Sequence, residues 1–210
     1  MNLDAFEKIF EAKIATLATP DDPAHDLLHF KRVVKTAKQL CKAEGAKLEV
    51  VIPAAWLHDF VNVPKNDPRR SQASKLSADA AEKFLISHNY PSEYFKDIKH
   101  AIEAHSYSAN IEASSLEAKI VQDADRLDGL GAIGIARCFS TGGSLKRLFY
   151  SEQDPFAQSR TPDDMQFTVD HFFVKLFKVV SSLQTREGKA EGERRLNLMK
   201  QYLSDLKAEI

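Results

Sequence analysis

A histidine and an aspartate close the most apolar stretch of the chain. The run from Val50 to Leu57 ends on His58 and Asp59. Adjacent side chains leave a helix about 100° apart, so both reach one point only where the helix ends or meets another element. Imidazole together with carboxylate suits divalent Mn, Mg, Fe or Zn. The pair therefore predicts either a metal site or, in the simpler interpretation, polar residues that cap a core helix.

A second pair of histidines lies earlier, in a helix predicted to begin at Asp22-Pro23 and to end at Gly45. His25 and His29 are four residues apart and share one face of that helix. They can share a metal, or one can bind it while the other positions water or substrate. The alternative is two half-buried surface histidines. Arg32 follows His29 by three residues, and its planar guanidinium suits an anionic substrate such as a phosphate.

A basic and hydroxyl-rich stretch opens the fourth predicted helix. It contains Arg69, Arg70 and Lys75 and follows a loop from Phe60 to Pro68. The N-terminus of a helix offers free backbone N–H groups and the positive end of the helix dipole. The stretch therefore predicts a cradle for phosphate, or a helix start that only faces water.

Another histidine, His105, ends the helix predicted from Ser92, much as His58 ends its own helix. His100 lies five residues earlier and does not share a face with it. At most one of the two is expected to reach the site, and His105 is the better candidate.

Three aspartates interrupt the apolar helix predicted from Ala118 to Leu130. A carboxylate in such a helix is costly unless it is solvated, paired or bound to metal. Asp125 and Asp128 share one face, whereas Asp123 points elsewhere. A structural ion pair with Arg126 remains the alternative to a metal role.

Bulk composition limits the kinds of partner. The 210 residues carry 29 Lys and Arg against 30 Asp and Glu, so the net charge of -1 attracts neither a nucleic-acid polymer nor an anionic membrane. Two cysteines in apolar helical patterns predict reduced core thiols. The first residues show no basic stretch followed by an apolar core, and no apolar run approaches about 18 residues, so neither a secretory signal nor a membrane span is expected. We expect a soluble, cytoplasmic protein that binds a small molecule, with its oligomeric state left open.

Apolar residues recur with helical spacing along most of the chain, and the sequence contains no convincing strand. The pattern predicts an all-α protein, a helical bundle in one domain over residues 1–210. Beyond the helices named above, it predicts one from Leu3 to Leu17, one that begins at Thr161-Pro162 with good capping chemistry, and one from about Lys189.

The order His29, His58-Asp59, Asp125 resembles the HD superfamily of metal-dependent phosphohydrolases, whose pattern is a His, a His-Asp pair and a distant Asp. It is most similar to the small stand-alone bacterial members. The resemblance implies an HD metal-binding core over residues 20–145, with the helices of residues 146–210 packed on it. It also implies that His29, His58, Asp59 and Asp125 ligate one divalent cation. Manganese is expected first, with Mg, Fe, Co, Ni or Zn as alternatives.

The resemblance also implies a reaction, in which metal-activated water attacks a phosphoester or phosphoanhydride bond. The expected catalytic residues are His58 and Asp59 at the metal, with His25 or His105 as proton donor to the leaving oxygen. Four cations would bind the substrate: Arg32, Arg69, Arg70 and Lys75.

Two sequence differences from other members of the HD superfamily narrow the choice of expected substrate. Phe60-Val61-Asn62-Val63 follows Asp59 in place of the Glu-Asp pair of alarmone hydrolases, and the Gly-Tyr-Pro signature of cyclic-di-GMP phosphodiesterases is absent. The similarity favours a nucleotide, with a nucleoside triphosphate as one choice. The rival expectation is a catalytically silent HD module that binds metal or nucleotide and signals without turnover.

Overall fold

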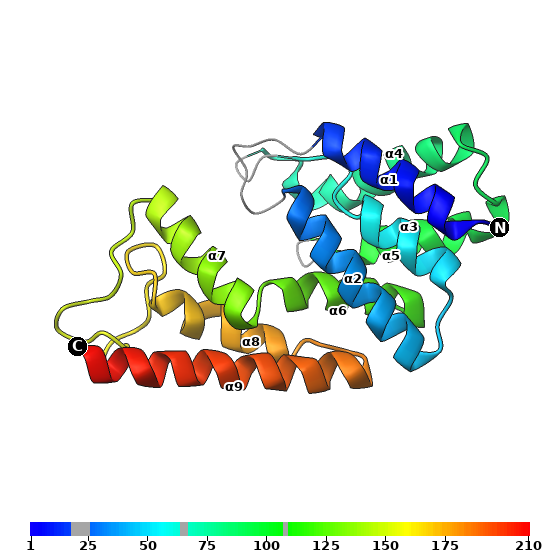
Figure 1. Ribbon diagram of the computed structural model, residues 1–210. Coiled ribbons are helices and arrows are strands. Elements are labelled where there is room, and N and C mark those ends of the chain that lie inside the picture. The colour runs from blue at the N-terminus through cyan, green and yellow to red at the C-terminus, as the bar shows by residue number, and fades with distance from the viewer. Residues whose placement is uncertain (18–25, 64–66, 107–108) are drawn as a thin grey trace. The chain divides into compact units, whose positions relative to one another are not determined.

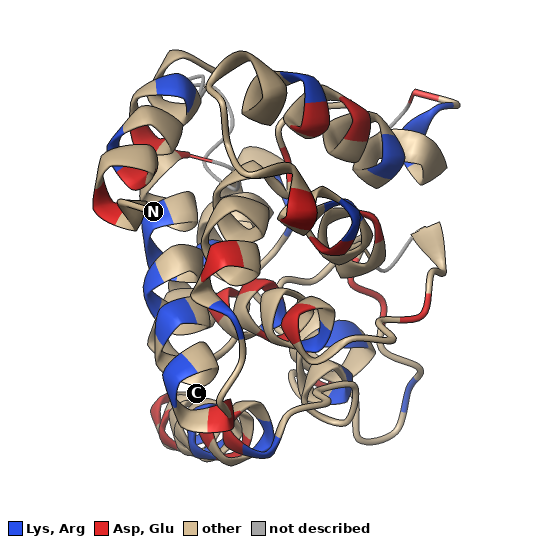
Figure 2. Cartoon of the chain, turned by 90° about the vertical axis from the view of Figure 1, so that its right-hand side faces the viewer, with Lys and Arg blue, Asp and Glu red and all other residues tan. Residues whose placement is uncertain are grey.

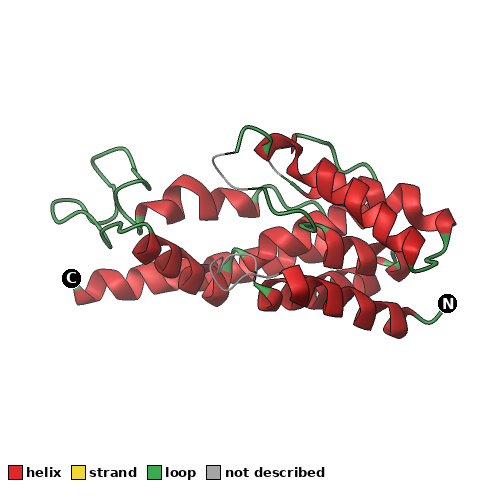
Figure 3. Ribbon diagram, turned by 90° about the horizontal axis from the view of Figure 1, so that it is seen from above, coloured by secondary structure: helices red, strands yellow, loops and turns green. Residues whose placement is uncertain are grey.

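The computed structural model describes residues 1–17, 26–63, 67–106 and 109–210. Within these ranges the regular structure is helical, and the only β-type pairing is an isolated bridge between Leu148 and Phe167 (Figures 1 and 3). The all-α class predicted from the sequence is therefore confirmed.

Most of the helices follow one another closely, but a long loop separates α7 from the next helical turn. In chain order they are α1 (Leu3–Leu17), α2 (Leu27–Glu44), α3 (Leu48–Leu57), α4 (Ala73–Ser87), α5 (Phe95–His105), α6 (Leu116–Asp128), α7 (Gly131–Ser144), a π-helical turn (Phe172–Leu176), α8 (Phe177–Val180) and α9 (Arg186–Glu209).

The chain forms two compact units. The first comprises Met1–Asp125 together with Gln184–Gly188, and the second comprises Arg126–Leu183 together with Lys189–Ile210. The division falls within α6, whereas the sequence suggested a core over 20–145 followed by helices over 146–210. Those two expected ranges stay predictions.

In the first unit, α3 is the central element. It contacts α1, α2, α4 and α5, and every residue from Val50 to Leu57 is buried. A helix that is apolar on all sides is stable only when other elements cover all of it. The polar residues that follow it, His58 and Asp59, are therefore held at the end of a rigid support.

A proline inside α3 leaves one backbone carbonyl without its usual donor. Pro53 has no N–H to offer to the carbonyl of Glu49, four residues earlier. The Tyr90 hydroxyl donates to that carbonyl at 2.6 Å, and Tyr90 itself is buried. A side chain distant in sequence thus replaces the missing bond of the central helix.

Both ends of α2 are capped. The Asp26 side chain accepts a hydrogen bond from the His29 backbone N–H at 2.7 Å, and Gly45 closes the helix with φ of 75°. The predicted end at Gly45 is confirmed. The predicted start at Asp22-Pro23 is wrong, because the cap is Asp26 and the helix begins at Leu27; the two predicted capping residues lie outside the described ranges.

The second unit has its own apolar core. Phe172 is fully buried and its ring stacks on Tyr202 of α9, with 6.1 Å between centroids, while Phe139 of α7 lies against both rings. Gly142 lets α7 pack closely against Thr168, because a β-carbon at position 142 would collide with the Thr168 side chain.

The helix predicted from Thr161 is wrong over its first part, because regular helix begins only near Asp170. The backbone N–H groups of Thr168 and Val169 donate to the carbonyls of Leu148 and Phe149, at 2.8 and 2.9 Å. These long-range bonds use donors that a helix would need.

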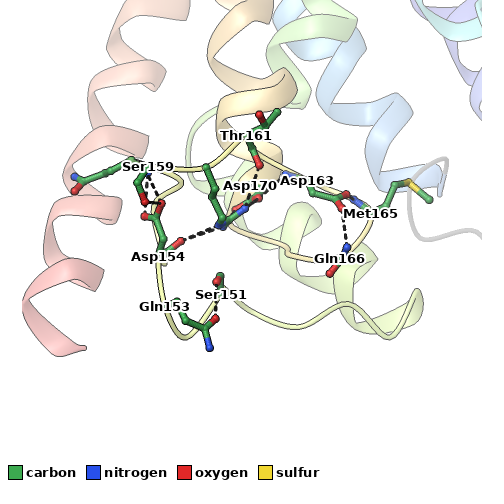
Figure 4. Close-up of polar contacts among 11 residues, drawn as sticks. Ser151, Gln153, Asp154, Ser159, Thr161, Asp163, Met165, Gln166 and Asp170 are labelled. Atoms are coloured by element: carbon green, nitrogen blue, oxygen red, sulfur yellow. Dashed lines mark hydrogen bonds and ion pairs between the residues drawn. The ribbon is translucent and has the colours of Figure 1, made fainter.

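The buried Asp170 carboxylate holds the same loop in place (Figure 4). It accepts hydrogen bonds from the Arg160 guanidinium and from the Asp163 backbone N–H. Arg160 also lies over the Phe167 ring, 4.8 Å from its centroid.

Basic and acidic residues are spread over many helices, in keeping with the net charge of -1 (Figure 2). No helix of the described residues combines the length and the apolar character that crossing a membrane requires.

Candidate metal centre

The candidate ligands lie at or near the ends of four helices, all in the first unit. His29 lies in the first turn of α2, and His58 with Asp59 follows the last residue of α3. His105 is the last residue of α5, and Asp125 lies within α6. A helix end releases its side chains from the packed core, which explains how polar residues of apolar helices can meet.

One group of possible ligand atoms comprises His29, His58 and Asp125, all within 4.8 Å of one another. The Nε2 atoms of the two histidines are 3.4 Å apart. The Asp125 Oδ1 lies 3.6 Å from Nε2 of His29 and 3.9 Å from Nε2 of His58. Three residues separated by almost one hundred positions thus converge.

A second group comprises His58, Asp59 and His105, so His58 belongs to both. Asp59 places Oδ2 3.6 Å from Nε2 of His58 and Oδ1 3.5 Å from Nε2 of His105. The three imidazoles are buried, whereas 20% of the Asp59 side chain and 30% of the Asp125 side chain are exposed. The two carboxylates are therefore the more exposed part of the centre.

Backbone carbonyls fix the tautomers of two histidines. Nδ1 of His58 lies 2.9 Å from the Ala55 carbonyl, and Nδ1 of His105 lies 2.6 Å from the Ile102 carbonyl. A carbonyl oxygen only accepts, so each Nδ1 carries the proton and donates it. In the neutral ring Nε2 then keeps its lone pair, as a metal ligand requires.

Burial and neighbouring charges give the two histidines different acidities. Desolvation lowers the pKa of His58 to about 4, despite the opposing effect of the Asp59 and Asp125 carboxylates. Burial acts in the same direction on His105, but the hydrogen bond that its ring donates to Asp59 and the charges of both carboxylates outweigh it, so the pKa of His105 is raised. At neutral pH His58 is thus a neutral imidazole, while His105 is better able to hold a second proton.

The geometry and the donor set fit a divalent metal ion. Two nitrogen or oxygen ligands about 2.1 Å from one ion lie roughly 3.0 to 3.5 Å apart. The 3.4 Å between Nε2 of His29 and Nε2 of His58 falls in this range. Two imidazoles with a carboxylate at their edge form a borderline to hard ligand set of the kind that Mn, Fe or Zn accepts.

The expected substrate-binding residues have varied surroundings. Arg32 is half-buried and lies one turn after His29 on α2. The Arg69 guanidinium pairs with the Asp67 carboxylate at 2.8 Å, the Arg70 guanidinium donates to the Val63 carbonyl at 2.7 Å, and Lys75 is exposed in the first turn of α4.

His25, the other histidine of the predicted pair with His29, lies outside the described residues, so its role stays a prediction. His100 is engaged elsewhere, because its Nε2 accepts from the Ser114 backbone N–H at 3.1 Å.

The aspartates of α6 serve different structures. Asp128 pairs with Arg137 of α7 at 2.5 Å, while the Arg126 guanidinium donates to the Ser182 carbonyl. Asp123 is fully buried and accepts hydrogen bonds from Gln184 and Thr185. The sequence indicated that Asp123 points away from Asp125, but no local signal identified its partners.

Comparison with known proteins agrees with this arrangement. The family model described as HD domain matches residues 27–130, which include all five residues of the two groups. The uncharacterized protein YpgQ of Bacillus subtilis (strain 168) is 31% identical over 202 residues, which cover 94% of this chain and 90% of that protein.

Two similar crystal structures extend the comparison to the fold. That of Bacillus subtilis YpgQ in complex with ADP has a TM-score of 0.76 at 30% identity and covers 97% of this chain and 94% of its own. That of an HD-superfamily hydrolase from Bacillus thuringiensis has a TM-score of 0.77 at 30% identity and covers 98% and 97%.

Fold and site define an all-α protein with groups of buried histidines and partly exposed aspartates able to hold a metal ion. The similarity to YpgQ over nearly the whole of both chains identifies the family: the protein belongs to the HD superfamily.

Proposed function

We propose that the protein is a metal-dependent phosphohydrolase that cleaves a phosphoester or phosphoanhydride bond of a nucleotide. The observation that carries the proposal is the convergence of His29, His58 and Asp125 within 4.8 Å, with Asp59 and His105 sharing His58. Manganese is the preferred ion, with Mg, Fe, Co, Ni and Zn as alternatives.

His29, His58, Asp59 and Asp125 are the proposed metal ligands. The Nδ1–H bond to the Ala55 carbonyl holds the His58 ring so that its Nε2 faces Nε2 of His29. A divalent ion held there supplies Lewis-acid chemistry, since it polarises a phosphate oxygen and lowers the pKa of water to near neutrality.

Protein groups supply the remaining steps. His105 holds a proton on Nε2, favoured by Asp59 Oδ1 at 3.5 Å, and donates it to the leaving oxygen. His25 stays the alternative donor. The guanidinium of Arg32 contacts the phosphate oxygens one turn from His29, with Arg69, Arg70 and Lys75 as further cations for a polyphosphate chain.

The nucleotide part of the proposal is supported by the similar YpgQ of Bacillus subtilis, whose crystal structure is a complex with ADP. A diphosphate or triphosphate also suits a chain in which several cations are expected around one metal. The rival proposal is a module that binds metal or nucleotide without turnover, and the similarity to a protein that forms a complex with ADP is compatible with it as well.

The proposal is tested by metal analysis of the purified protein together with a nucleotide panel assayed with added Mn²⁺. We expect one tightly held ion per chain and release of phosphate or pyrophosphate from a nucleoside triphosphate. Asp59→Ala should abolish turnover. Asp79→Ala, at an exposed carboxylate on α4 that pairs with Lys99, is the control and should leave turnover unchanged.

The outcomes separate the alternatives. Metal and nucleotide binding without product from any nucleotide, or from p-nitrophenyl phosphate, would favour the silent module. A protein that retains no divalent ion after dialysis against Mn²⁺ would contradict the metal-dependent hydrolase and every form of the silent module that binds metal.

A further inference from the structure

A short segment far along the chain lies beside the helices that carry the candidate ligands. Residues Gln184–Gly188, here called the returning segment, belong to the first unit although the residues before and after them belong to the second. The returning segment precedes and opens α9, and its polar groups contact α6 directly.

Asp123 is the main contact of the returning segment. Its carboxylate is fully buried and accepts from the backbone N–H of Gln184 at 2.9 Å, the backbone N–H of Thr185 at 2.8 Å and the Thr185 hydroxyl at 2.7 Å. Such bonds, close to the positive N-terminal end of α9, offset the cost of burying a negative charge.

Steric fit makes this contact specific. The Thr185 Oγ1 also accepts from the Gly188 backbone N–H at 3.0 Å, which is the pattern of a helix N-cap. A β-carbon at Gly188 would collide with Asp123 Oδ2. Only glycine therefore allows the first turn of α9 to close over the carboxylate.

Helix geometry links Asp123 to the metal centre. Residues two apart on a helix point about 200° away from each other, so Asp123 and Asp125 leave opposite sides of α6. Bonds that fix the rotation of α6 through Asp123 therefore also fix the direction in which Asp125 points.

A second chain of bonds leads to His105. The Gln184 side-chain amide donates to the Gln122 Oε1, and Nε2 of Gln122 donates to the Ala104 carbonyl at 2.7 Å. Ala104 immediately precedes His105 at the end of α5. The returning segment thus contacts Asp123, two residues before Asp125, and is connected through Gln122 to Ala104, the residue before His105.

We infer that Asp123 is a positioning residue that anchors the returning segment beside the candidate metal centre. It fixes Asp125 through the rotation of α6, and by holding Gln184 it fixes His105 through Gln122 and Ala104. The inference rests on the proposed metal site for its functional meaning. The positioning itself can be measured without metal or substrate.

The first experiment is NMR of the imidazole resonances in the metal-free full-length protein. Asp123→Asn keeps the side-chain shape but turns an amide toward the donors of Gln184 and Thr185. We expect altered resonances for His105 and His58. The matched control is Asp170→Asn, which removes another fully buried carboxylate that accepts from a backbone N–H and a side chain (Figure 4). It should leave both resonances in place.

A milder pair of variants guards against loss of folding. Thr185→Val removes the hydroxyl that bonds Asp123, whereas Thr185→Ser keeps it. Thr185→Val should shift the same resonances in the same direction as Asp123→Asn, and Thr185→Ser should match the wild type. If Asp123→Asn fails to fold, this pair decides the matter.

Mn²⁺ affinity, measured by electron paramagnetic resonance titration, gives the second readout. Loss of outer-sphere support weakens metal affinity by about 10-fold to 100-fold, so we expect about tenfold weaker binding in Asp123→Asn and no change in Asp170→Asn. Unchanged histidine resonances in Asp123→Asn and Thr185→Val, or equal shifts in Asp170→Asn, would overturn the inference. If the wild type binds no Mn²⁺, the proposed function fails while the resonances still decide the positioning.

Discussion

His58 and His105 end two different helices in the same way. Each donates Nδ1–H to the carbonyl three residues earlier in its own helix, Ala55 and Ile102 respectively. The rings meet edge to face with centroids 4.9 Å apart, and Asp59 lies within 3.6 Å of Nε2 of both. Two histidines with one carboxylate between them are thus oriented by their own helices.

The first prediction concerns the protonation of His58 in metal-free protein. Because burial lowers its pKa to about 4, we expect imidazole nitrogen resonances of a neutral Nδ1–H ring from pH 7 down to near pH 4. The unfolded chain takes up this proton near pH 6.5, so the contribution of His58 to stability is complete above pH 6.5 and is lost as the pH falls toward 4. Titration of His58 above pH 6 would contradict the assignment, with His58→Gln identifying the resonance.

The second prediction concerns stabilisation by metal. An ion that binds only the folded state, present at 100 times its dissociation constant, raises the free energy of unfolding by about 2.7 kcal/mol. Urea unfolding with Mn²⁺ and with EDTA should show this difference in the wild type. Asp125→Ala should remove it, and Asp79→Ala should retain it. An equal response in both variants would place the ion elsewhere.

Much of the fold could be predicted because its signals are local. The apolar run ending on His58 and Asp59 indicated a buried helix with polar groups at its end, and Gly45 marked the end of α2. Helical spacing of apolar residues depends only on neighbours along the chain, so it can be recognised without knowledge of the tertiary structure.

The errors arose where distant residues decide the local structure. Capping residues at Thr161 predicted a helix, but the Asp170 carboxylate and the carbonyls of Leu148 and Phe149 hold that backbone in a loop. The contact between Asp123 and Thr185 joins residues 62 positions apart and has no periodicity that a sequence could reveal.

The third prediction concerns the support of α3 by Tyr90. Tyr90→Phe leaves the Glu49 carbonyl without the donor that replaces the missing N–H of Pro53, so we expect a loss of about 1 kcal/mol in urea unfolding. In a Pro53→Ala background the new N–H at position 53 satisfies that carbonyl, and Tyr90→Phe should cost less. The same loss in both backgrounds would show that the hydroxyl does not compensate for the proline.

The fourth prediction separates two roles for His105. As a proton donor it must be protonated to act, and its pKa is raised, so the rate should fall as the pH rises through that pKa. His105→Gln should lower kcat by about 10²-fold to 10⁴-fold and remove this alkaline decline, while KM and Mn²⁺ content stay near those of the wild type.

A ligand role for His105 predicts a different pattern, because loss of a ligand weakens metal binding before it affects proton transfer. Mn²⁺ content in His105→Gln would then fall as it does in Asp125→Ala, and excess Mn²⁺ would restore the rate together with the alkaline decline. The two variants assayed side by side, over the same range of pH and Mn²⁺ concentration, therefore determine whether Nε2 of His105 carries a proton or contacts the ion.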